Sequence, residues 1–569
     1  MQSLSSRRFY SNKRDTKMPT AAEALALLQN MDPCDSDGGE ESFLLQESLD
    51  SDMSSSDEMS SGSESRPPPK KKGRMETQTR PNDPNCETAK DGTVWVKEEV
   101  GRPLPHSYLE PYTCDGEPTE EVRSTVKTRL QSFCCLVSLD ILDIIRKCTT
   151  EHGRRKEAGW DMSVHELMAF ISILLWRGVL RIPSLADAWS TTLGFSQVKT
   201  IMARNRCQDI MRHLSFDEKD TRPQRVETDK FALVSNVWQM FVANCIKSYD
   251  PGQYITIDKQ LFPTKSHCPF LQYIASKPDK FGIKFWVAYD LKSKYMCNAM
   301  PYLGKDLSRP SEETRSEDVA MKLMEPFMDK GRTVTTDNYF TSLSLAQQLL
   351  SRKTSLVGTI NKTRRELPPS AKQLDCKKFT TQVFSTTDTT LTVYAPKRRK
   401  TICILSTMHS TVEIRDNHKM KPNTVTDYNT MKCGVDVMDQ KVRQYTVRAA
   451  TRRWPVAVFF NMIDMAAVNA HMLYRACTGV KERRVDFLAN LAKELAEQFM
   501  QEKMVEKEKL LCQQPATPCP WKRAMCQVTI RCKKNHANSR CVHCHKYTCG
   551  KCRQETKWQC QKCADKSDH

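Results

Sequence analysis

Two apolar stretches of the chain each end on an aspartate: QYITIDKQ at residues 253–260 and RTVTTDNYFTS at residues 332–342. Their β-branched and aromatic residues favour buried strands, and Asp258 and Asp337 stand where the apolar runs stop. A buried carboxylate needs a partner, and local sequence fixes no basic residue beside Asp337. The pair therefore predicts either a shared cation or two hydrogen-bonded structural aspartates.

A third acidic site opens the helix predicted for YNTMKCGVDVMDQKVRQY, residues 428–445. Asp436 and Asp439 are three residues apart, so both carboxylates share one face of that helix. A solvated helix carries such pairs too, but this one adjoins Gly434 and precedes a run of arginines. The added carboxylates favour the cation over the structural alternative.

The predicted elements between these sites follow a recognisable order. Strands are expected at 283–290 and 295–301, a helical crossover at 311–330, a strand ending at Asp337, and then a helix and a short strand at 356–360. This order is typical of an α/β fold with a ribonuclease-H-like (RNase H-like) core. Residues 361–430 interrupt it with strand-like TLTVYA and TICILST around a basic PKRRK, which predicts an inserted β-rich module.

Composition limits the possible functions. The 569 residues suffice for two to four domains, and no continuous run of eighteen apolar residues is present, so we expect no membrane span. The net charge is +19, and residues 32–65 hold eleven acidic residues without Lys or Arg, so the remainder is more basic still. A polyanionic partner is the natural inference, although scattered surface lysines explain part of the charge.

The N-terminal residues predict disorder, because they are rich in Ser, Asp, Glu and Pro and poor in aromatics. PPPKKKGR at 67–74 suits a nuclear import signal, with a chance basic patch as the alternative. From about residue 122 to 248 apolar spacings of three and four predict core helices.

Ten of the 24 cysteines follow residue 510, and their CxxC spacing favours zinc over disulfides. The three CxxC pairs are Cys541 with Cys544, Cys549 with Cys552, and Cys560 with Cys563. Because one Zn²⁺ takes four ligands, two structural zinc ions need a fourth pair. Cys526 and Cys532 are the candidates, and His536 is an alternative for one of them. Such a tail binds either DNA or protein.

The chain resembles the piggyBac transposases from about residue 122 to 491 and in its C-terminal cysteines. The resemblance rests on PGQYITIDKQ, CPF, KPDKFGIK, VTTDNYFTS, VGTINKTRRELP, YNTMKCGVDVMDQ and RRWPVAVFFNMIDMAAVNA. It implies an RNase H-like DDD core in which Asp258, Asp337 and Asp436 bind two Mg²⁺ ions and Asp439 is accessory. It also implies cutting and joining of double-stranded DNA at TTAA sequences. We expect a homodimer.

Some positions depart from the family pattern. Lys259 stands where the family usually has Glu, Ser266–His267 replaces a Gly-Arg pair, and Asn361 replaces an Arg. Alternation along a strand points Lys259 away from the face that carries Asp258, so metal binding should survive.

Basic residues predict the path of the DNA. Lys277, Lys280 and Lys284 form a loop beside the first carboxylate, and the resemblance implies that Arg364 and Arg365 approach DNA. Arg448, Arg452 and Arg453 precede Trp454, which either stacks on an unpaired base or packs the core. We expect these basic residues to form one continuous positive surface around Asp258.

The expected segments are a disordered acidic arm with a basic cluster (1–105), a helical dimerisation and DNA-binding region (106–252), the first part of the core (253–360), a β-rich insertion (361–430), the final core and DNA-binding helices (431–500), a linker (501–520) and a cysteine-rich zinc domain (521–569). Two functions follow: an Mg²⁺-dependent DNA transposase in the nucleus, or a DNA-binding protein derived from such an element that no longer transposes.

Overall fold

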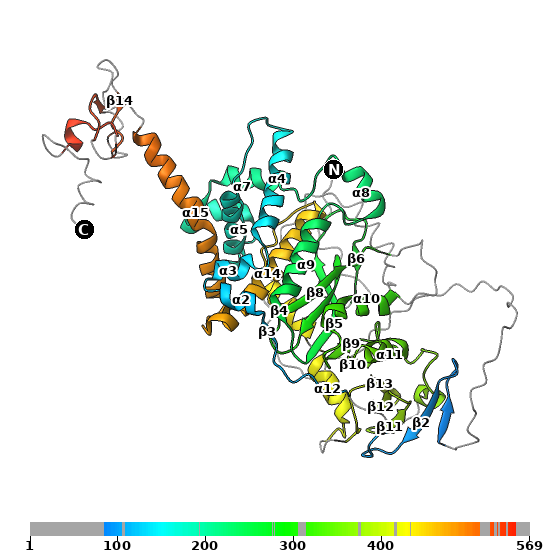
Figure 1. Cartoon of the computed structure of the whole chain (residues 1–569). Helices are drawn as coiled ribbons and strands as arrows, with labels where there is room; N and C mark the ends of the chain where they lie inside the picture. The colour runs from blue at the N-terminus through cyan, green and yellow to red at the C-terminus, as the bar shows by residue number, and fades with distance from the viewer. Residues whose placement is uncertain are drawn as a thin grey trace, which may run out of the picture.

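A long mixed sheet runs through the protein, with helices packed around its central strands (Figure 1). This computed structural model describes residues 85–512, apart from 105–108, 193, 276, 278, 305–314, 374–376, 415–417 and 433, and parts of 524–553. The acidic arm before residue 85 and the basic cluster at 67–74 lie outside the described residues.

The centre of the sheet is β5 (Tyr254–Pro263), which pairs in parallel with β9 (Thr333–Thr336) and antiparallel with β7 (Phe281–Asp290). β8 (Met296–Pro301) pairs with β7, and β10 (Ser355–Thr359) lies parallel to β9. These strands are buried on both faces, which explains their nearly continuous apolar and β-branched sequence. The mixed α/β architecture predicted from the sequence is confirmed.

The β-rich module continues the same sheet. β11 (Thr381–Ser385), β12 (Thr390–Lys397) and β13 (Lys400–Ser406) form a meander, and β13 pairs with β10. The full order is β1-β2-β11-β12-β13-β10-β9-β5-β7-β6, with β8 beside β7. The insertion therefore extends the central sheet on the β10 side.

Disorder up to residue 105 is wrong for its last part. β1 (Cys86–Thr88) and β2 (Val94–Glu98) form a hairpin that adds to the edge of β11. Trp95 is fully buried there, and its indole N–H donates to the carbonyl of Glu366 at 2.7 Å. One buried aromatic residue and edge pairing order a segment whose overall composition predicts disorder.

The helices that precede β5 in the chain are α2 (Glu120–Thr125), α3 (Arg129–Cys134), α4 (Leu139–Arg154), α5 (Val164–Val179), α6 (Ser196–Ile201), α7 (Arg204–His213), α8 (Arg222–Thr228) and α9 (Ser235–Ser248). The helices between or after the strands of the sheet are α10 (Arg315–Met324), α11 (Leu343–Ser351), α12 (Asn423–Met431), α13 (Gly434–Gln444), α14 (Trp454–Thr478) and α15 (Arg484–Cys512). Short strand pairs join β3 (Glu117–Pro118) to β4 (Tyr249–Asp250) and β14 (Ala524–Met525) to β15 (His536–Ala537), and β6 (Gln272–Tyr273) is an edge strand.

α14 is the buried centre of the helical part. By length and composition alone it is apolar enough to cross a membrane, but 94% of its most apolar window is buried inside the protein. Polar residues such as Asn461 and Asp464 interrupt its apolar sequence, so the chain still has no continuous run of eighteen apolar residues. The burial is that of a core helix.

α15 links the core to the cysteine-rich part at its far end (Figure 1). Arg129 at the start of α3 forms ion pairs with Glu482 at 2.9 Å and Glu494 at 3.0 Å. Ser172 of α5 donates to the carbonyl of Ala492 at 2.5 Å. These contacts fix the first half of α15 on the helical layer.

Candidate active site and cysteine cluster

The parallel pair of central strands brings two carboxylates to neighbouring positions. Ile257 of β5 lies opposite Thr336 of β9, and Asp258 and Asp337 are the next residues on the two paths. The backbone N–H of Lys259 donates to Asp258 Oδ1 at 2.7 Å. The strand register therefore accounts for the proximity that the two apolar runs predict.

A tight turn fixes the backbone of Asp337. Its carbonyl accepts from the N–H groups of Phe340 and Thr341 at 3.2 and 3.1 Å, and its Oδ1 accepts from the N–H of Tyr339 at 3.0 Å. Ser342 then caps α11 by accepting from the N–H of Leu345. The motif after Asp337 is thus a turn and a helix start, and it aims one carboxylate oxygen away from the backbone.

The two carboxylates repel each other. The pKa of Asp258 is raised to about 7, first by burial and then by the nearby Asp337 carboxylate, while Lys259 and Lys277 act in the opposite direction. Burial and a like charge both disfavour the ionised form. A cation shared by the two groups removes both costs, so the electrostatics of this pair fit a metal-binding role.

The third acidic segment approaches β5 through its glycine. A Cβ atom at Gly434 would lie 3.1 Å from Thr256 Oγ1, a tight contact, so glycine lets α13 start this close to β5 without displacing Thr256. The Thr256 hydroxyl also donates to the carbonyl of Met431, at the end of α12, at 2.8 Å. These contacts place Asp436 in the first turn of a helix that packs beside β5. Asp439 is buried one turn further on.

Two lysines neutralise the flanks of this site. Lys277 Nζ lies 3.2 Å from Asp439 Oδ2, and both side chains are mostly buried. On the other flank, Lys259 Nζ lies 3.5 Å from Asp337 Oδ2.

Lys259 therefore reaches the site through Asp337 rather than through Asp258. Alternation does separate Lys259 from Asp258 along β5. Asp337, however, follows the last paired residue of β9, so alternation within the sheet does not govern its position relative to Lys259. The long lysine side chain spans the remaining distance, and Asp337 gains a basic partner that local sequence does not reveal.

The donor set is one of hard carboxylate oxygens, which suits Mg²⁺. In the part of the chain that the structure describes, only the cysteine group discussed below has three or more possible ligand atoms within 4.8 Å of one another. Asp258, Asp337 and Asp439 border one region, but their oxygen atoms do not all lie within 4.8 Å of one another. Asp337 and Asp439 each form an ion pair with a lysine. The residue types fit a divalent cation, and in this structure two of the carboxylates are paired with lysines instead.

The predicted DNA-binding residues fall into two groups. Lys280, Arg365 and Arg452 are exposed. Arg364 is half-buried, and its carbonyl accepts from Lys372 Nζ. These residues remain predictions for DNA contact.

The other basic residues have internal contacts. Lys284 Nζ lies 3.7 Å from the centre of the Trp286 ring. Arg448 donates to the carbonyl of Pro263 at 3.0 Å, and Arg453 donates to the carbonyls of Leu214, at 2.7 Å, and Met211, at 2.5 Å. These guanidinium groups hold the loop before α14 against β5 and α7.

Trp454 packs in the core, which decides between the two alternatives for this residue. Its ring stacks on Phe231 at 5.7 Å and meets Phe270 edge-on at 5.0 Å. Only 8% of the residue is exposed, so no face of the ring is available to a base.

Two features of the site escape sequence reasoning. Asp464 of α14 is buried and accepts from the Thr446 hydroxyl at 2.6 Å and the Val447 N–H at 2.8 Å, which anchors the segment between α13 and α14. Burial raises its pKa to about 7. Beside Asp337, Tyr339 is 41% exposed and stacks on Trp286 at 5.0 Å. An acidic residue within an otherwise largely apolar helix was the available signal for Asp464.

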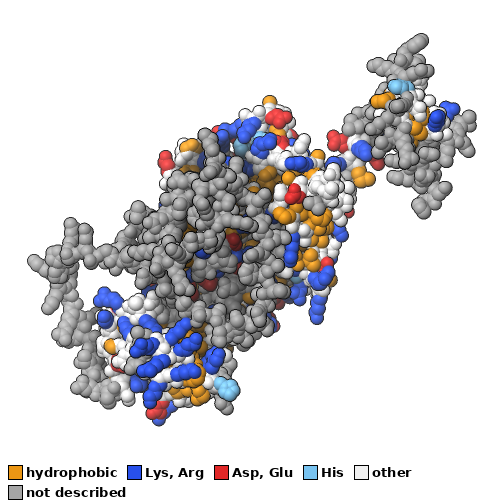
Figure 2. Space-filling view, turned by 180° about the vertical axis from the view of Figure 1, so that it is seen from behind, with side chains coloured by type: hydrophobic (Ala, Val, Ile, Leu, Met, Phe, Trp, Pro, Cys, Tyr) orange, Lys and Arg blue, Asp and Glu red, His pale blue; other side chains and the backbone are white. Residues whose placement is uncertain are grey.

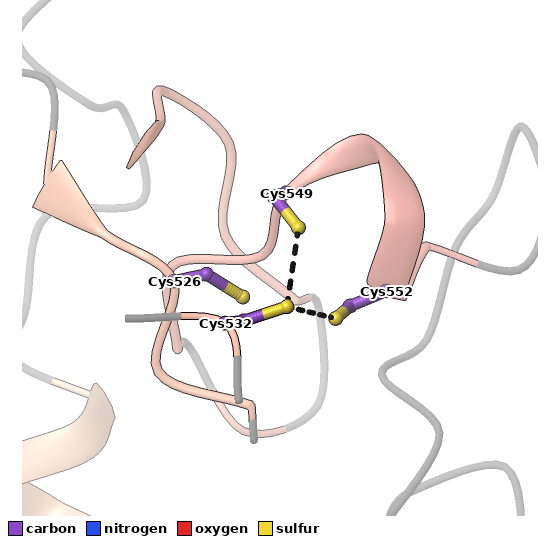
Figure 3. A group of neighbouring side chains, drawn as sticks. All are labelled: Cys526, Cys532, Cys549 and Cys552. Atoms are coloured by element: carbon purple, nitrogen blue, oxygen red, sulfur yellow. Dashed lines mark hydrogen bonds between the residues drawn. The ribbon is translucent and has the colours of Figure 1, made fainter. Parts of the chain in front are cut away.

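Four cysteines of the tail converge on one point (Figure 3). The sulfur atoms of Cys526, Cys532, Cys549 and Cys552 all lie within 4.8 Å of one another, with Cys532 3.3 Å from Cys552 and 3.9 Å from Cys549. Four thiolates at this spacing fit a tetrahedral metal ion.

This grouping bears on the predicted ligand pairs. Cys526 and Cys532 meet the second CxxC pair, Cys549 and Cys552, and His536 stands outside this cluster as an exposed residue of β15. Cys541 and Cys544 pack in the same small core but are not part of the four-sulfur group. The remaining pair, Cys560 and Cys563, lies outside the described residues.

Comparison with known proteins assigns the family. A family model described as Transposase IS4 matches residues 129–471, more than half of the chain. The human PiggyBac transposable element-derived protein 3 is 21% identical over 395 residues, which cover 65% of each chain. The human PiggyBac transposable element-derived protein 2 is 22% identical over 419 residues, 70% of this chain and 68% of the relative.

The chain thus matches slightly less than two thirds of the first of these relatives. Among solved structures, a piggyBac transposase synaptic complex with hairpin DNA, determined by cryo-EM, aligns with a TM-score of 0.68 and 29% identity, over 79% of this chain and 100% of the other. The chain belongs to the piggyBac-type transposases of the transposase IS4 family.

Proposed function

We propose that the protein is a metal-dependent DNA transposase that cuts double-stranded DNA at its element's ends and joins them to TTAA targets. The observation that carries this proposal is the register of β5 and β9, which sets Asp258 and Asp337 side by side with mutually repelling charges. In this proposal β5, β7 and β8 followed by β9 and β10 are the sheet of an RNase H-like core. The antiparallel meander and the two parallel strands support that reading.

Each carboxylate has a role in the proposed reaction. Asp258 is central and shared, while Asp337 and Asp436 each complete one side of the site and Asp439 lies next to it. When bound, divalent cations such as Mg²⁺ would lower the pKa of the attacking water and stabilise charge on the leaving oxygen. The chain contributes the fixed strand ends, the turn that orients Asp337 and the close approach of α13 to β5.

The DNA backbone would be held by exposed basic residues near and beyond the site. Lys and Arg side chains gather on the module of β11, β12 and β13 (Figure 2). Exposed members of this patch are Lys377, Lys378, Lys397, Arg398 and Arg399. Phosphate neutralisation by such residues gives affinity without sequence preference. The solved relative, a transposase complexed with hairpin DNA, supports DNA as the ligand.

Further parts of the proposal concern assembly and location. The four-cysteine cluster would hold one structural Zn²⁺, and Cys541, Cys544, Cys560 and Cys563 a second. We also propose a homodimer that acts in the nucleus. A synaptic complex in the solved relative supports the pairing of DNA ends.

A second candidate function is that of a transposase-derived DNA-binding protein without transposition activity. The ion pair between Lys259 and Asp337 favours it, because an internal ammonium competes with a metal ion for that carboxylate. Both human relatives are, by name, transposable element-derived proteins. The two functions share DNA binding and differ in strand cleavage.

Cleavage of DNA carrying the inverted repeats that flank the coding region tests the choice. Purified full-length protein with Mg²⁺ should nick the repeat ends, and Asp258→Asn, Asp337→Asn and Asp436→Asn should each abolish nicking while leaving DNA binding intact. Asp140→Asn, at an exposed position in α4, is the matched control and should cleave normally. Binding without nicking by the unmodified protein would instead select the second function.

A further inference from the structure

The internal ion pair at Asp337 bears on how many metal ions the site can hold. Lys259 and Asp337 retain only 29% and 23% of their side-chain exposure, so their contact at 3.5 Å is partly shielded from solvent. An ammonium group in such a place interacts more strongly with the carboxylate than a surface lysine does. It also repels any divalent ion at the same carboxylate.

The surroundings hold both partners in place. Lys259 lies directly opposite Trp286 across the β5–β7 pair, so the two residues share a face of the sheet. Trp286 is buried, and Tyr339 stacks on it. The Tyr339 backbone N–H in turn holds Asp337 Oδ1 at 3.0 Å. Lysine and carboxylate are therefore set by neighbouring elements rather than by a chance surface encounter.

The two flanks of the site differ in their connections. Lys277, the partner of Asp439, belongs to the loop between β6 and β7. Lys259 belongs to β5 itself, the central strand, which is paired on both sides. The backbone of Lys259 is therefore fixed by strand pairing on both sides, whereas that of Lys277 lies in a loop.

We propose that the Lys259 ammonium takes the place of one of the two divalent cations, so that this chain's site binds a single Mg²⁺ or Mn²⁺ ion on the side of Asp258 away from Asp337. The inference rests on the proposed function, since it concerns the same carboxylates. Lys259 is then a positioning residue that orients Asp337 and supplies positive charge on that side. A phosphate oxygen entering there would meet an ammonium group instead of a second metal ion.

Counting bound Mn²⁺ by electron paramagnetic resonance tests this directly, without reference to activity. The full-length, zinc-loaded protein should bind one Mn²⁺ at this site with the signal of an isolated ion. Lys259→Met, which removes the charge and keeps the side-chain length, should bind a second ion at least about ten-fold more tightly than the unmodified chain does. Two ions about 4 Å apart should give an exchange-coupled spectrum.

Matched variants separate charge from shape. Lys259→Arg keeps the charge and should still bind one ion, and Lys259→Gln provides a second neutral variant if the methionine variant folds poorly. Lys265→Met removes an exposed lysine just beyond the same strand and should leave the count at one. Asp258→Asn should remove the bound ion and identifies the site.

The outcomes distinguish the two levels of the proposal. Two Mn²⁺ ions in the unmodified protein, or one ion in both neutral variants, would overturn the role of Lys259 and leave a metal-dependent transposase standing. A count unaffected by Asp258→Asn would show that these carboxylates form no metal centre, which overturns the proposed function as well.

Discussion

Replacing Asp258 by Asn should stabilise the metal-free protein and abolish DNA cleavage. The pKa of Asp258 is raised from 3.8 to about 7 by burial and by Asp337. The folded chain therefore holds this proton more tightly than the unfolded chain. The stability that results is complete below pH 3.8 and is lost as the pH rises through 7. Near pH 8 the ionised carboxylate destabilises the fold, and the neutral amide of Asn does not.

The magnitude follows from the difference in pKa. A difference of about 3 corresponds to about 4 kcal/mol of unfolding free energy. Solvent reaches the half-buried carboxylate and weakens the repulsion, so we expect about half of this, about 2 kcal/mol. With roughly 2 cal/mol/K of unfolding entropy per residue and a core of about 400 residues, Tm should rise by about 2 °C.

Thermal unfolding near pH 8 measures this change. The buffer should lack Mg²⁺ but contain no chelator, because chelation would also remove zinc from the tail. Added Mg²⁺ should then raise the Tm of the unmodified protein by mass action and leave that of Asp258→Asn unchanged. Asp140→Asn serves as the control. A variant destabilised by more than about 1 kcal/mol, with an unchanged response to Mg²⁺, would identify Asp258 as a structural residue.

Other substitutions test the surrounding framework. The pKa of Asp464 is about 7 in the folded chain, so the unmodified protein should lose about 1–3 kcal/mol of unfolding free energy as the pH rises from 4 to 7. Asp464→Asn should remove this loss, and a pH dependence equal to that of the unmodified chain would contradict the prediction. Trp95→Ala should lower the unfolding free energy by about 3–5 kcal/mol and release the hairpin of β1 and β2 from β11, which new protease cleavage within that hairpin would detect. Neutralising Arg364 and Arg365 together should lower the slope of log binding constant against log salt by at most about two, and loss of sequence preference with the slope unaltered would assign them another role. Cys549→Ser should lower the zinc content by one ion in native mass spectrometry of the full chain, and an unchanged count would exclude the four-cysteine site.

Sequence reasoning succeeds for this fold where a local pattern has one physical cause. β-branched runs ending on Asp258 and Asp337 predict buried strands, and the order of elements between them predicts a mixed sheet with crossover helices. The structure adds the register, in which Ile257 and Thr336 are partners. Register depends on long-range pairing, which alternation in one segment does not contain.

Prediction from composition is wrong where one or two buried residues order a segment whose average composition is polar. The hairpin of β1 and β2 lies within a polar arm, yet Trp95 buries completely and bonds to the Glu366 carbonyl. Composition averages over such a residue. For the arginine run before α14, DNA contact stays a prediction, and the structure adds that Arg448 and Arg453 donate to backbone carbonyls that become neighbours only in the folded chain.

The ion pair between Lys259 and Asp337 shows what the sequence of one segment leaves out, and it bears directly on metal binding. Alternation gives the direction of Lys259 relative to Asp258, while the turn after β9 decides where Asp337 points, and only the two together create an ion pair at 3.5 Å. Half-buried carboxylates need a counter-charge in the absence of metal, and Lys259 and Lys277 supply it. The same two charges oppose metal binding. Under the proposed function, the balance between these charges and the divalent cation would decide between DNA cleavage and DNA binding alone, with every aspartate of the site still in place.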